Sequence, residues 1–161
     1  EMIRSLIDII TQRDADSRIG LGSYSEAYES GELTTQKEDK QQFMLGDNRS
    51  LDEIICELAD LGHIVSFCTA GYRCGRTGKK IMTLLESGRE GCFCKLNAVL
   101  TFQEWLEDFA SEKTKQIGEK IIQKEIEEIK QRVPQDFSEN VYEHFIKAYE
   151  KIINGERDLY F

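Results

Sequence analysis

The sequence has little basic charge and no long apolar run. Its 161 residues include 21 Lys and Arg against 30 Asp and Glu, a formal net charge of −9. Binding nucleic acid through a broad basic field requires clustered Lys and Arg, so the charge argues against a nucleic-acid-binding protein. The same charge argues against adhesion to anionic membrane surfaces. No segment approaches the roughly 18–20 apolar residues of a membrane span, so we do not expect a transmembrane protein.

The first residues, EMIRSLIDII, lack the pattern of a secretory signal. They contain no basic region followed by an apolar stretch and a small-residue cleavage site. We therefore expect a cytoplasmic protein. The length favours one domain over residues 1–161, and an apolar content of 40% suffices for one modest core.

The cysteines do not form any familiar motif. An odd number of them in a chain without an export signal argues against a disulfide framework. The five are Cys56, Cys68, Cys74, Cys92 and Cys94. The last four follow the pattern Cys-x5-Cys-x17-Cys-x-Cys, which lacks the knuckles of zinc sites. It also lacks the Cys-x3-Cys-x2-Cys of radical-initiating clusters and the Cys-x2-Cys-x2-Cys of ferredoxins. Spacing alone therefore favours small buried thiols over ligands.

Apolar periodicity predicts a mainly α protein with one minor β element near residues 63–67. We predict a polar loop over 13–42, with a short strand near 18–21, and a second loop over 87–97. The predicted helices cover 2–12, 51–60, 79–86, 102–110, 112–133 and a last segment from Ser138 to Gly155.

Several helix ends carry a recognisable signal. Ser50–Glu53 and Thr101–Glu104 have the spacing of capping boxes. Gly62 and Gly155 are expected to end helices; Pro134, the single proline, is expected to do the same. The two C-terminal helices then form a hairpin with apolar stripes directed into the core. The stripes are Ile117, Ile121, Ile122, Ile126, Ile129 and Val133, and then Val141, Phe145, Ala148, Tyr149 and Ile152.

A glycine-punctuated loop, CTAGYRCGRTG over residues 68–78, directly follows the predicted strand. Its glycines allow close approach of the backbone to a bound group. Arg73 and Arg76 are cations beside thiols and favour the thiolate, the form that ligates iron. Cys94 returns from the second predicted loop. Ordinary surface charge remains the alternative interpretation of the two arginines.

Several ordered segments resemble a known family. They are FMLGDNRSLDEII, SFCTAGYRCGRTG, LNAVLTFQEWLEDFAS and NGERDLYF. Over residues 43–161 the chain resembles the C-terminal region of the HydG family, the radical S-adenosylmethionine (SAM) tyrosine lyases that mature FeFe-hydrogenase. A weaker likeness covers SRIGLGSY, residues 17–24. The related ThiH-like lyases share the architecture but not the cysteine loop.

The resemblance implies a C-terminal domain that holds an auxiliary 4Fe–4S cluster. In the family, fragments of tyrosine become the CO and CN ligands of an iron synthon there. The family pattern Cys-x2-Cys-x22-Cys places its first and third ligands on Cys68 and Cys94. The second falls on Gly71, which cannot ligate iron, and Cys74 or Cys92 is the candidate replacement. Because of Gly71, absence of a cluster is an equally open expectation.

Three functions remain open at this point. The first is an iron–sulfur domain with no catalytic residue and no radical SAM chemistry by this chain alone, since the radical SAM barrel is absent. The second is a degenerate relative without a cluster that acts as a scaffold or interaction protein. The third is a mononuclear metal site on Cys68, Cys74, Cys92 and Cys94. The expected partner is a second copy or a separate barrel or maturation protein, because the family region packs against a barrel.

Overall fold

Helices dominate the part of the chain that the structure describes. The computed structural model describes residues 49–67, 75, 77–86, 90–136 and 139–160. Within these ranges the helices are α3 (Leu51–Asp60), α5 (Gly78–Glu86), α6 (Glu90–Asp108), α7 (Glu112–Asp136) and α8 (Glu139–Ile153). The mainly α prediction is confirmed. Among the helices so described, none is long and apolar enough to cross a membrane.

The chain divides into two compact units, Glu1–Glu57 and Leu58–Phe161. In the first unit the description begins at residue 49, so the predicted helix 2–12, the loop 13–42 and the strand near 18–21 lie outside the described residues. The expectation of a single domain over 1–161 stays a prediction. The second unit contains α5 to α8 and is the part that bears on function.

Helix α3 begins and ends as the sequence predicts. The Ser50 backbone N–H donates to Glu53 Oε2 at 2.9 Å, and the Glu53 N–H donates to Ser50 Oγ at 3.2 Å. This reciprocal capping box satisfies two donors that the first turn leaves without helical partners. Hydrogen bonds from Ser50 lower the pKa of the Glu53 carboxyl. At the other end Gly62 has φ +88°, and the His63 N–H donates to the Leu58 carbonyl, a Schellman motif.

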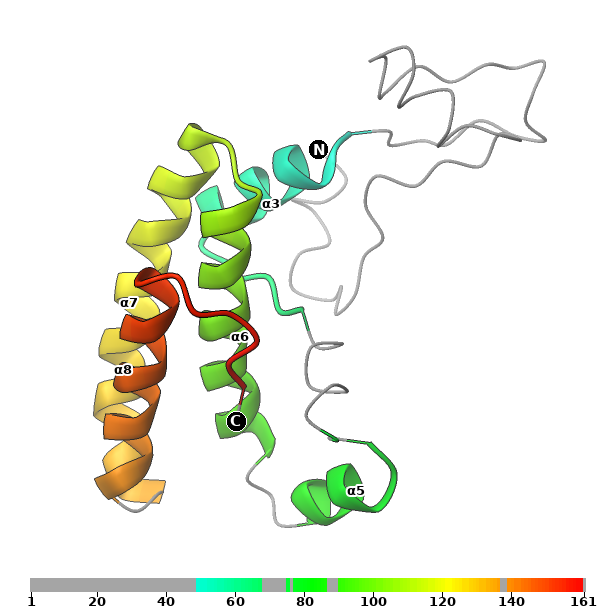
Figure 1. The fold of residues 1–161 in the computed structure, drawn as a ribbon, viewed down its shortest axis with the longest axis vertical. Coiled ribbons are helices and arrows are strands. Elements are labelled where there is room, and N and C mark those ends of the chain that lie inside the picture. The colour runs from blue at the N-terminus through cyan, green and yellow to red at the C-terminus, as the bar shows by residue number, and fades with distance from the viewer. Residues whose placement is uncertain (1–48, 68–74, 76, 87–89, 137–138, 161) are drawn as a thin grey trace, which may run out of the picture. The chain divides into compact units, whose positions relative to one another are not determined.

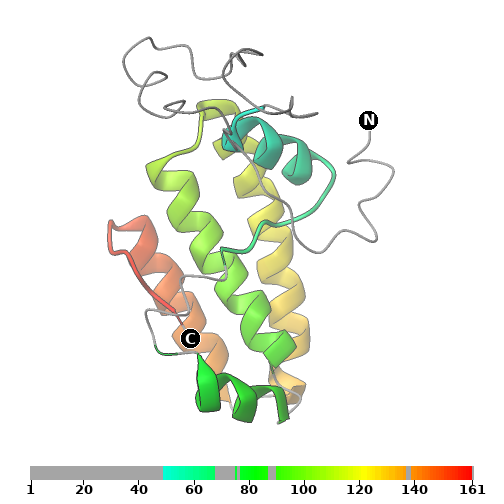
Figure 2. The same ribbon diagram turned by 90° about the vertical axis from the view of Figure 1, so that its right-hand side faces the viewer.

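Helices α6, α7 and α8 form an up-down-up bundle, in which α6 contacts both of the others (Figures 1 and 2). The core is apolar and includes residues from all three helices. Its fully buried members are Leu96, Val99, Leu100, Phe102, Leu106, Ile122, Ile129, Phe145 and Ile152. Most members of the predicted stripes are buried, and α7 packs against α8, so the hairpin prediction is confirmed. Ile117 and Val141 are half-buried, and the side chain of Val133 lies outside the description.

Helix α7 extends past the predicted stop at Pro134. The helix runs from Glu112 to Asp136. Just before its first residue, Ser111 Oγ accepts a hydrogen bond from the Thr114 N–H at 3.4 Å. Proline has a helical φ, and near the end of the helix its missing amide donor and its ring disturb only the last turn. The predicted cap at Ser138 lies outside the described residues.

Helix α6 is the largest departure from the sequence prediction. A loop over 87–97 and a helix over 102–110 are expected, yet one helix runs from Glu90 to Asp108. Thr101 is therefore inside the helix, and its Oγ1 donates to the Asn97 carbonyl at 2.8 Å instead of capping a new helix. The capping box at Thr101 is wrong, because burial of Leu96 to Leu100 between α7 and α8 favours an unbroken helix.

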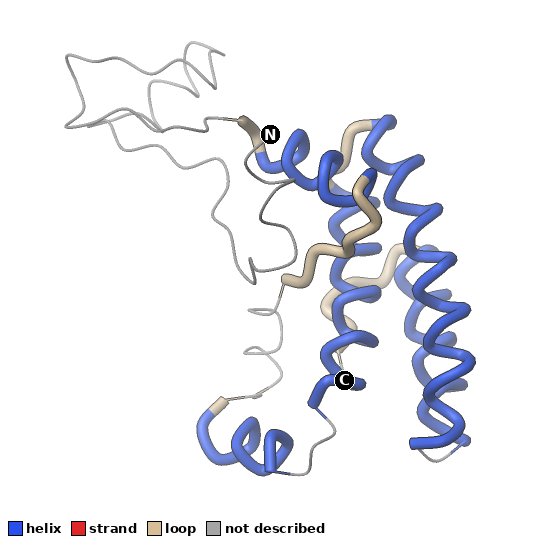
Figure 3. The backbone as a smooth tube through the Cα atoms, turned by 180° about the vertical axis from the view of Figure 1, so that it is seen from behind, coloured by secondary structure: helices blue, strands red, loops and turns tan. Residues whose placement is uncertain are grey.

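The predicted β element at residues 63–67 is also wrong. These residues form an irregular segment, and no strand is assigned among the residues described (Figure 3). A strand needs a neighbour to complete its ladder of hydrogen bonds. The segment packs through its last side chain instead: the Phe67 ring stacks on Trp105 of α6, with ring centroids 6.1 Å apart.

Candidate metal centre

Cys94 is exposed and lies in the first turns of α6. The next residue, Lys95, is partly buried, and its Nζ contacts Glu125 at 2.7 Å and Glu128 at 2.8 Å, both on α7. Partial burial works to lower the pKa of Lys95, but the hydrogen bonds to Glu125 and Glu128 outweigh it, so the pKa is raised. The ammonium therefore stays charged. These ion pairs hold the first turns of α6, and with them the backbone of Cys94, against α7.

The backbone of Cys92 lies in α6 as well, so both cysteines occupy a helix where a loop is predicted. Positions two apart on an α-helix do not share a face. The helix therefore disfavours joint ligation of one metal group by Cys92 and Cys94.

The remaining candidate ligands are not in the described residues. Cys68 and Cys74, the arginines Arg73 and Arg76, and Gly71 all lie within 68–74 or at 76. At the end of this loop Gly75 has φ +74° and Gly78 has φ +51°. Both angles are in the left-handed region that glycine adopts readily, so the chain turns at Gly75 and again at Gly78, the first residue of α5.

Cys56 is half-buried on α3. Its position on this helix suits a packing residue, since a free thiol behaves as a small apolar side chain. Within the described ranges no group of three or more His, Cys, Asp or Glu side chains is arranged to hold a metal ion. A metal centre with three or more such ligands would therefore include residues outside the described ranges, among which are Cys68 and Cys74.

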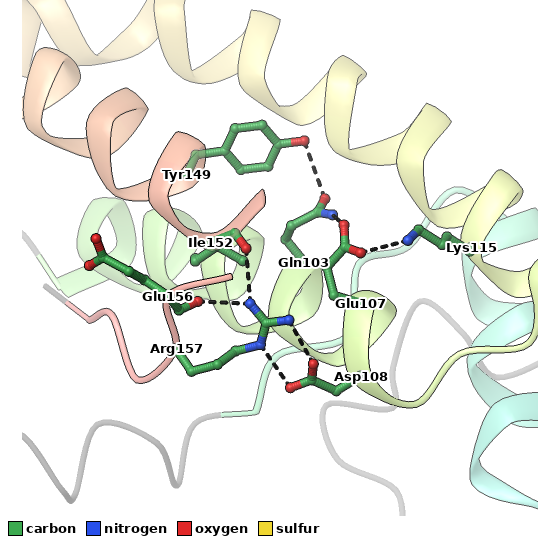
Figure 4. A network of polar contacts seen from close by, with 8 residues as sticks. All are labelled: Gln103, Glu107, Asp108, Lys115, Tyr149, Ile152, Glu156 and Arg157. Atoms are coloured by element: carbon green, nitrogen blue, oxygen red, sulfur yellow. Dashed lines mark hydrogen bonds and ion pairs between the residues drawn. The ribbon is translucent and has the colours of Figure 1, made fainter. Parts of the chain in front are cut away.

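A polar network joins the C-terminal end of α6 to α7 and α8 (Figure 4). The Tyr149 hydroxyl of α8 donates to Gln103 Oε1 at 3.2 Å, and Gln103 Nε2 donates to Glu107 Oε1 at 2.8 Å. Lys115 Nζ of α7 donates to Glu107 Oε2 at 2.6 Å. Gln103 is 2% exposed, so its hydrogen bonds are formed away from bulk water. The network joins all three helices through buried and partly buried side chains.

The C-terminal segment is attached to the same helix (Figure 4). Gly155 has φ +99°, and the Glu156 N–H donates to the Lys151 carbonyl, which ends α8 in a second Schellman motif. Arg157 then forms a bidentate pair with Asp108, Nη2 to Oδ1 at 2.6 Å and Nε to Oδ2 at 2.8 Å. This hydrogen-bonded pair lowers the pKa of Asp108.

The NGERDLYF segment, quoted above only for its resemblance, thus has a structural explanation. Its Leu159 N–H also donates to Glu104 Oε1 of α6 at 3.0 Å. The sequence pattern predicts no role for Gln103 or Arg157. Gln103 is a polar residue among the apolar core positions of its helix, and that pattern could have indicated a buried hydrogen bond. The contact between Arg157 and Asp108 joins residues 49 positions apart, so no local sequence pattern indicates it.

Comparison with solved structures shows that this chain is similar to part of a known protein. No family model matches the chain, and no curated protein matches it. A crystal structure of HydG, described as a maturase of the FeFe-hydrogenase, is 41% identical and covers 98% of this chain with a TM-score of 0.76. The chain spans 31% of the length of that protein. The resemblance to part of HydG is therefore confirmed in both sequence and fold.

Proposed function

Since 98% of the chain is similar to a maturase of the FeFe-hydrogenase at 41% identity, we propose that it is a HydG-like C-terminal domain that binds an auxiliary iron–sulfur cluster. Its role would lie in assembly of the iron, CO and CN synthon of the hydrogenase active site. The similarity is the observation that carries this proposal. The match extends over α3 to α8 and the C-terminal segment rather than over one motif.

The donor set fits a cluster in its chemistry. Thiolates are the ligands of iron–sulfur clusters, and the exposed Cys94 presents its sulfur outside the core. Cys68 and Cys74 would supply two further thiolates, with Arg73 and Arg76 favouring the charged form. Cys92 is the reserve ligand, since its place on α6 separates it from the face of Cys94. When bound, a cluster would supply iron for the synthon.

The proposal assigns no catalytic residue to these 161 residues. They contain no Cys-x3-Cys-x2-Cys motif, so this segment by itself does not cleave S-adenosylmethionine. The proposal further places the chain in the cytoplasm, beside a barrel or maturation protein or a second copy. Sedimentation at high concentration tests whether two copies of the chain associate.

Anaerobic iron–sulfur reconstitution of the full chain tests the proposal. Iron and sulfide bound per chain, with the broad visible absorption of a cluster, are expected for the wild type. Cys68→Ser, Cys74→Ser and Cys94→Ser should each lower bound iron strongly. Cys56→Ser is the matched control, because Cys56 lies on α3, and it should leave bound iron unchanged.

Two alternatives have their own signatures in the same experiment. A folded, colourless protein without iron after reconstitution would indicate a scaffold that has lost the cluster, as Gly71 at a family ligand position suggests. Bound zinc without sulfide would indicate a mononuclear thiolate site. Equal iron in the wild type and in the triple variant of Cys68, Cys74 and Cys94 would end the cluster proposal.

A further inference from the structure

Asn154 and Gly155 follow the last residue of α8 and form the only Asn-Gly pair in the sequence. An asparagine before glycine deamidates readily, because glycine has no Cβ and leaves its backbone nitrogen open to the preceding side chain. Asn154 is exposed, so water reaches its amide. The end of α8 therefore combines a reactive pair of residues with access to solvent.

Deamidation of such a pair needs water and no other reactant. The Gly155 nitrogen loses its proton and attacks Asn154 Cγ. The bond from Cγ to the side-chain nitrogen breaks, and that nitrogen takes up a proton and leaves as ammonia. The cyclic succinimide that results is opened by water at either carbonyl. The products are aspartate and isoaspartate at position 154, and isoaspartate adds a methylene group to the backbone.

The structure holds both reacting groups in hydrogen bonds. The Gly155 N–H donates to the Ile152 carbonyl at 3.0 Å, and Asn154 Nδ2 donates to the Glu150 carbonyl at 2.8 Å. The first of these bonds belongs to the Schellman motif in which Gly155 has φ +99°. The attacking nitrogen is therefore withheld, and the reaction requires that the end of α8 first opens.

Arg157 keeps this end of α8 closed (Figure 4). Its Nη1 donates to the same Ile152 carbonyl at 2.9 Å, while Nε and Nη2 form the bidentate pair with Asp108 at the end of α6. We call these contacts of Arg157 the C-terminal clasp. The Arg157 and Asp108 side chains are 31% and 39% exposed. Because an exposed ion pair contributes little free energy, the clasp opens locally more often than the bundle core unfolds.

We propose that Asn154 is a deamidation site and that opening of the C-terminal clasp sets its rate. The product opposes closure of the clasp. An aspartate lacks the donor that bonds the Glu150 carbonyl, and its charge is unfavourable at the C-terminal end of a helix. Isoaspartate lengthens the backbone within the cap. Deamidation thus converts a reversible opening into a lasting release of residues 156–160 from α6.

The first measurement follows deamidation of the purified full chain at mildly alkaline pH, by peptide mapping with mass spectrometry and separation of the two product isomers. Asp108→Ala and Arg157→Lys should each raise the rate at Asn154 about two- to fivefold, the factor that an exposed ion pair contributes to an equilibrium. Glu57→Ala is the matched control, because it removes another carboxylate paired with an arginine, Arg49, and it should keep the wild-type rate. Circular dichroism should show equal helix content in all four proteins.

Two internal references complete this measurement. The wild type unfolded in urea should deamidate at Asn154 faster than the folded protein does. Asn140 is also exposed on α8 but precedes Val141, whose branched side chain shields the backbone nitrogen, so it should react far more slowly. Equal rates in the wild type and both clasp variants would overturn the proposal. So would a folded wild type that reacts as fast as the unfolded chain.

The second measurement is hydrogen exchange at the Leu159 amide. This amide donates to Glu104 Oε1 at 3.0 Å and therefore reports the attachment of residues 156–160 to α6. Exchange should be faster in both clasp variants, in Asn154→Asp and in the deamidated wild type, while the amide of the buried Ile122 stays protected. Unchanged exchange at Leu159 after complete deamidation would overturn the lasting release. Neither measurement involves a metal, so the proposed function stands or fails separately.

Discussion

Gly118 of α7 lies directly against Leu106 of α6. A Cβ atom built on Gly118 would be 2.6 and 2.7 Å from the two methyl carbons of Leu106, and 3.2 Å from its Cγ. Leu106 is 1% exposed, so neighbouring core atoms oppose its movement. Glycine at this position allows the two helices to approach where any larger residue would force them apart.

Gly118→Ala should therefore destabilise the protein. Alanine improves helix propensity by about 1 kcal/mol, whereas overpacking a filled core costs about 1–3 kcal/mol. We expect a net loss in the free energy of unfolding measured in urea. In a Leu106→Ala background the same change should be stabilising, since the clash is gone. A Gly118→Ala protein more stable than the wild type would contradict the close approach.

The α7 stripe predicts a second stability effect. Ile122 is fully buried, and truncation of a core isoleucine costs about 2–5 kcal/mol. Ile122→Ala should shift the denaturant midpoint accordingly. Ile153→Ala is the control, because Ile153 is 53% exposed at the end of α8 and should change stability by less than about 0.5 kcal/mol. Equal effects of the two would mean that the stripe does not face the core.

Tyr149 predicts a dependence of stability on alkaline pH. Burial raises the pKa of its phenol above the ordinary value of 10.0. A group whose pKa is raised in the folded state contributes stability that is present below the unfolded pKa and is lost as the pH rises through the folded pKa. Unfolding of the wild type should therefore become easier above a pH of about 10, beyond the general effect of alkali.

Tyr149→Phe separates this contribution from the rest. At neutral pH it removes the donor to the buried Gln103 Oε1, at a cost of about 1–3 kcal/mol. Above pH 10 the variant has no phenol to ionise at this position, so the difference in stability from the wild type should narrow. Parallel stability curves from pH 8 to 11, measured by urea unfolding, would contradict the prediction.

The departure at Gly71 gives a direct test of ligand placement. Cys74→Ser should lower reconstituted iron, and addition of Gly71→Cys should restore it by returning a thiolate to the family position. Iron and sulfide per chain are the measurement, with Gly71→Ser in the same background as the control for a side chain without a thiol. Failure of Gly71→Cys to restore iron would show that the loop does not adopt the family geometry.

Local sequence signals accounted for the helix ends of α3 and the core face of α7. Ser50 and Glu53 are three residues apart and form their capping box within one turn, and Gly62 and Gly155 supply the left-handed backbone that a Schellman motif requires. These are contacts between near neighbours in the chain. The candidate cysteine ligands, by contrast, came from the resemblance to the family pattern, because spacing alone favoured small buried thiols.

The start of α6 and the path of residues 63–67 could not be obtained in that way. The polar and glycine-containing stretch before Leu96 has the composition of a loop. It nevertheless belongs to a helix that begins at Glu90, because packing of the apolar face of α6 against α7 and α8 outweighs weak local helix propensity. The apolar run that ends at Phe67 has strand composition, and its partner is Trp105, 38 positions later in the chain, not another strand. By itself the sequence determined which residues are apolar, where α3 begins and where α3 and α8 end, and which thiols are available. Only the tertiary structure decided which of these groups meet, because a contact between distant residues depends on the packing of every element that lies between them.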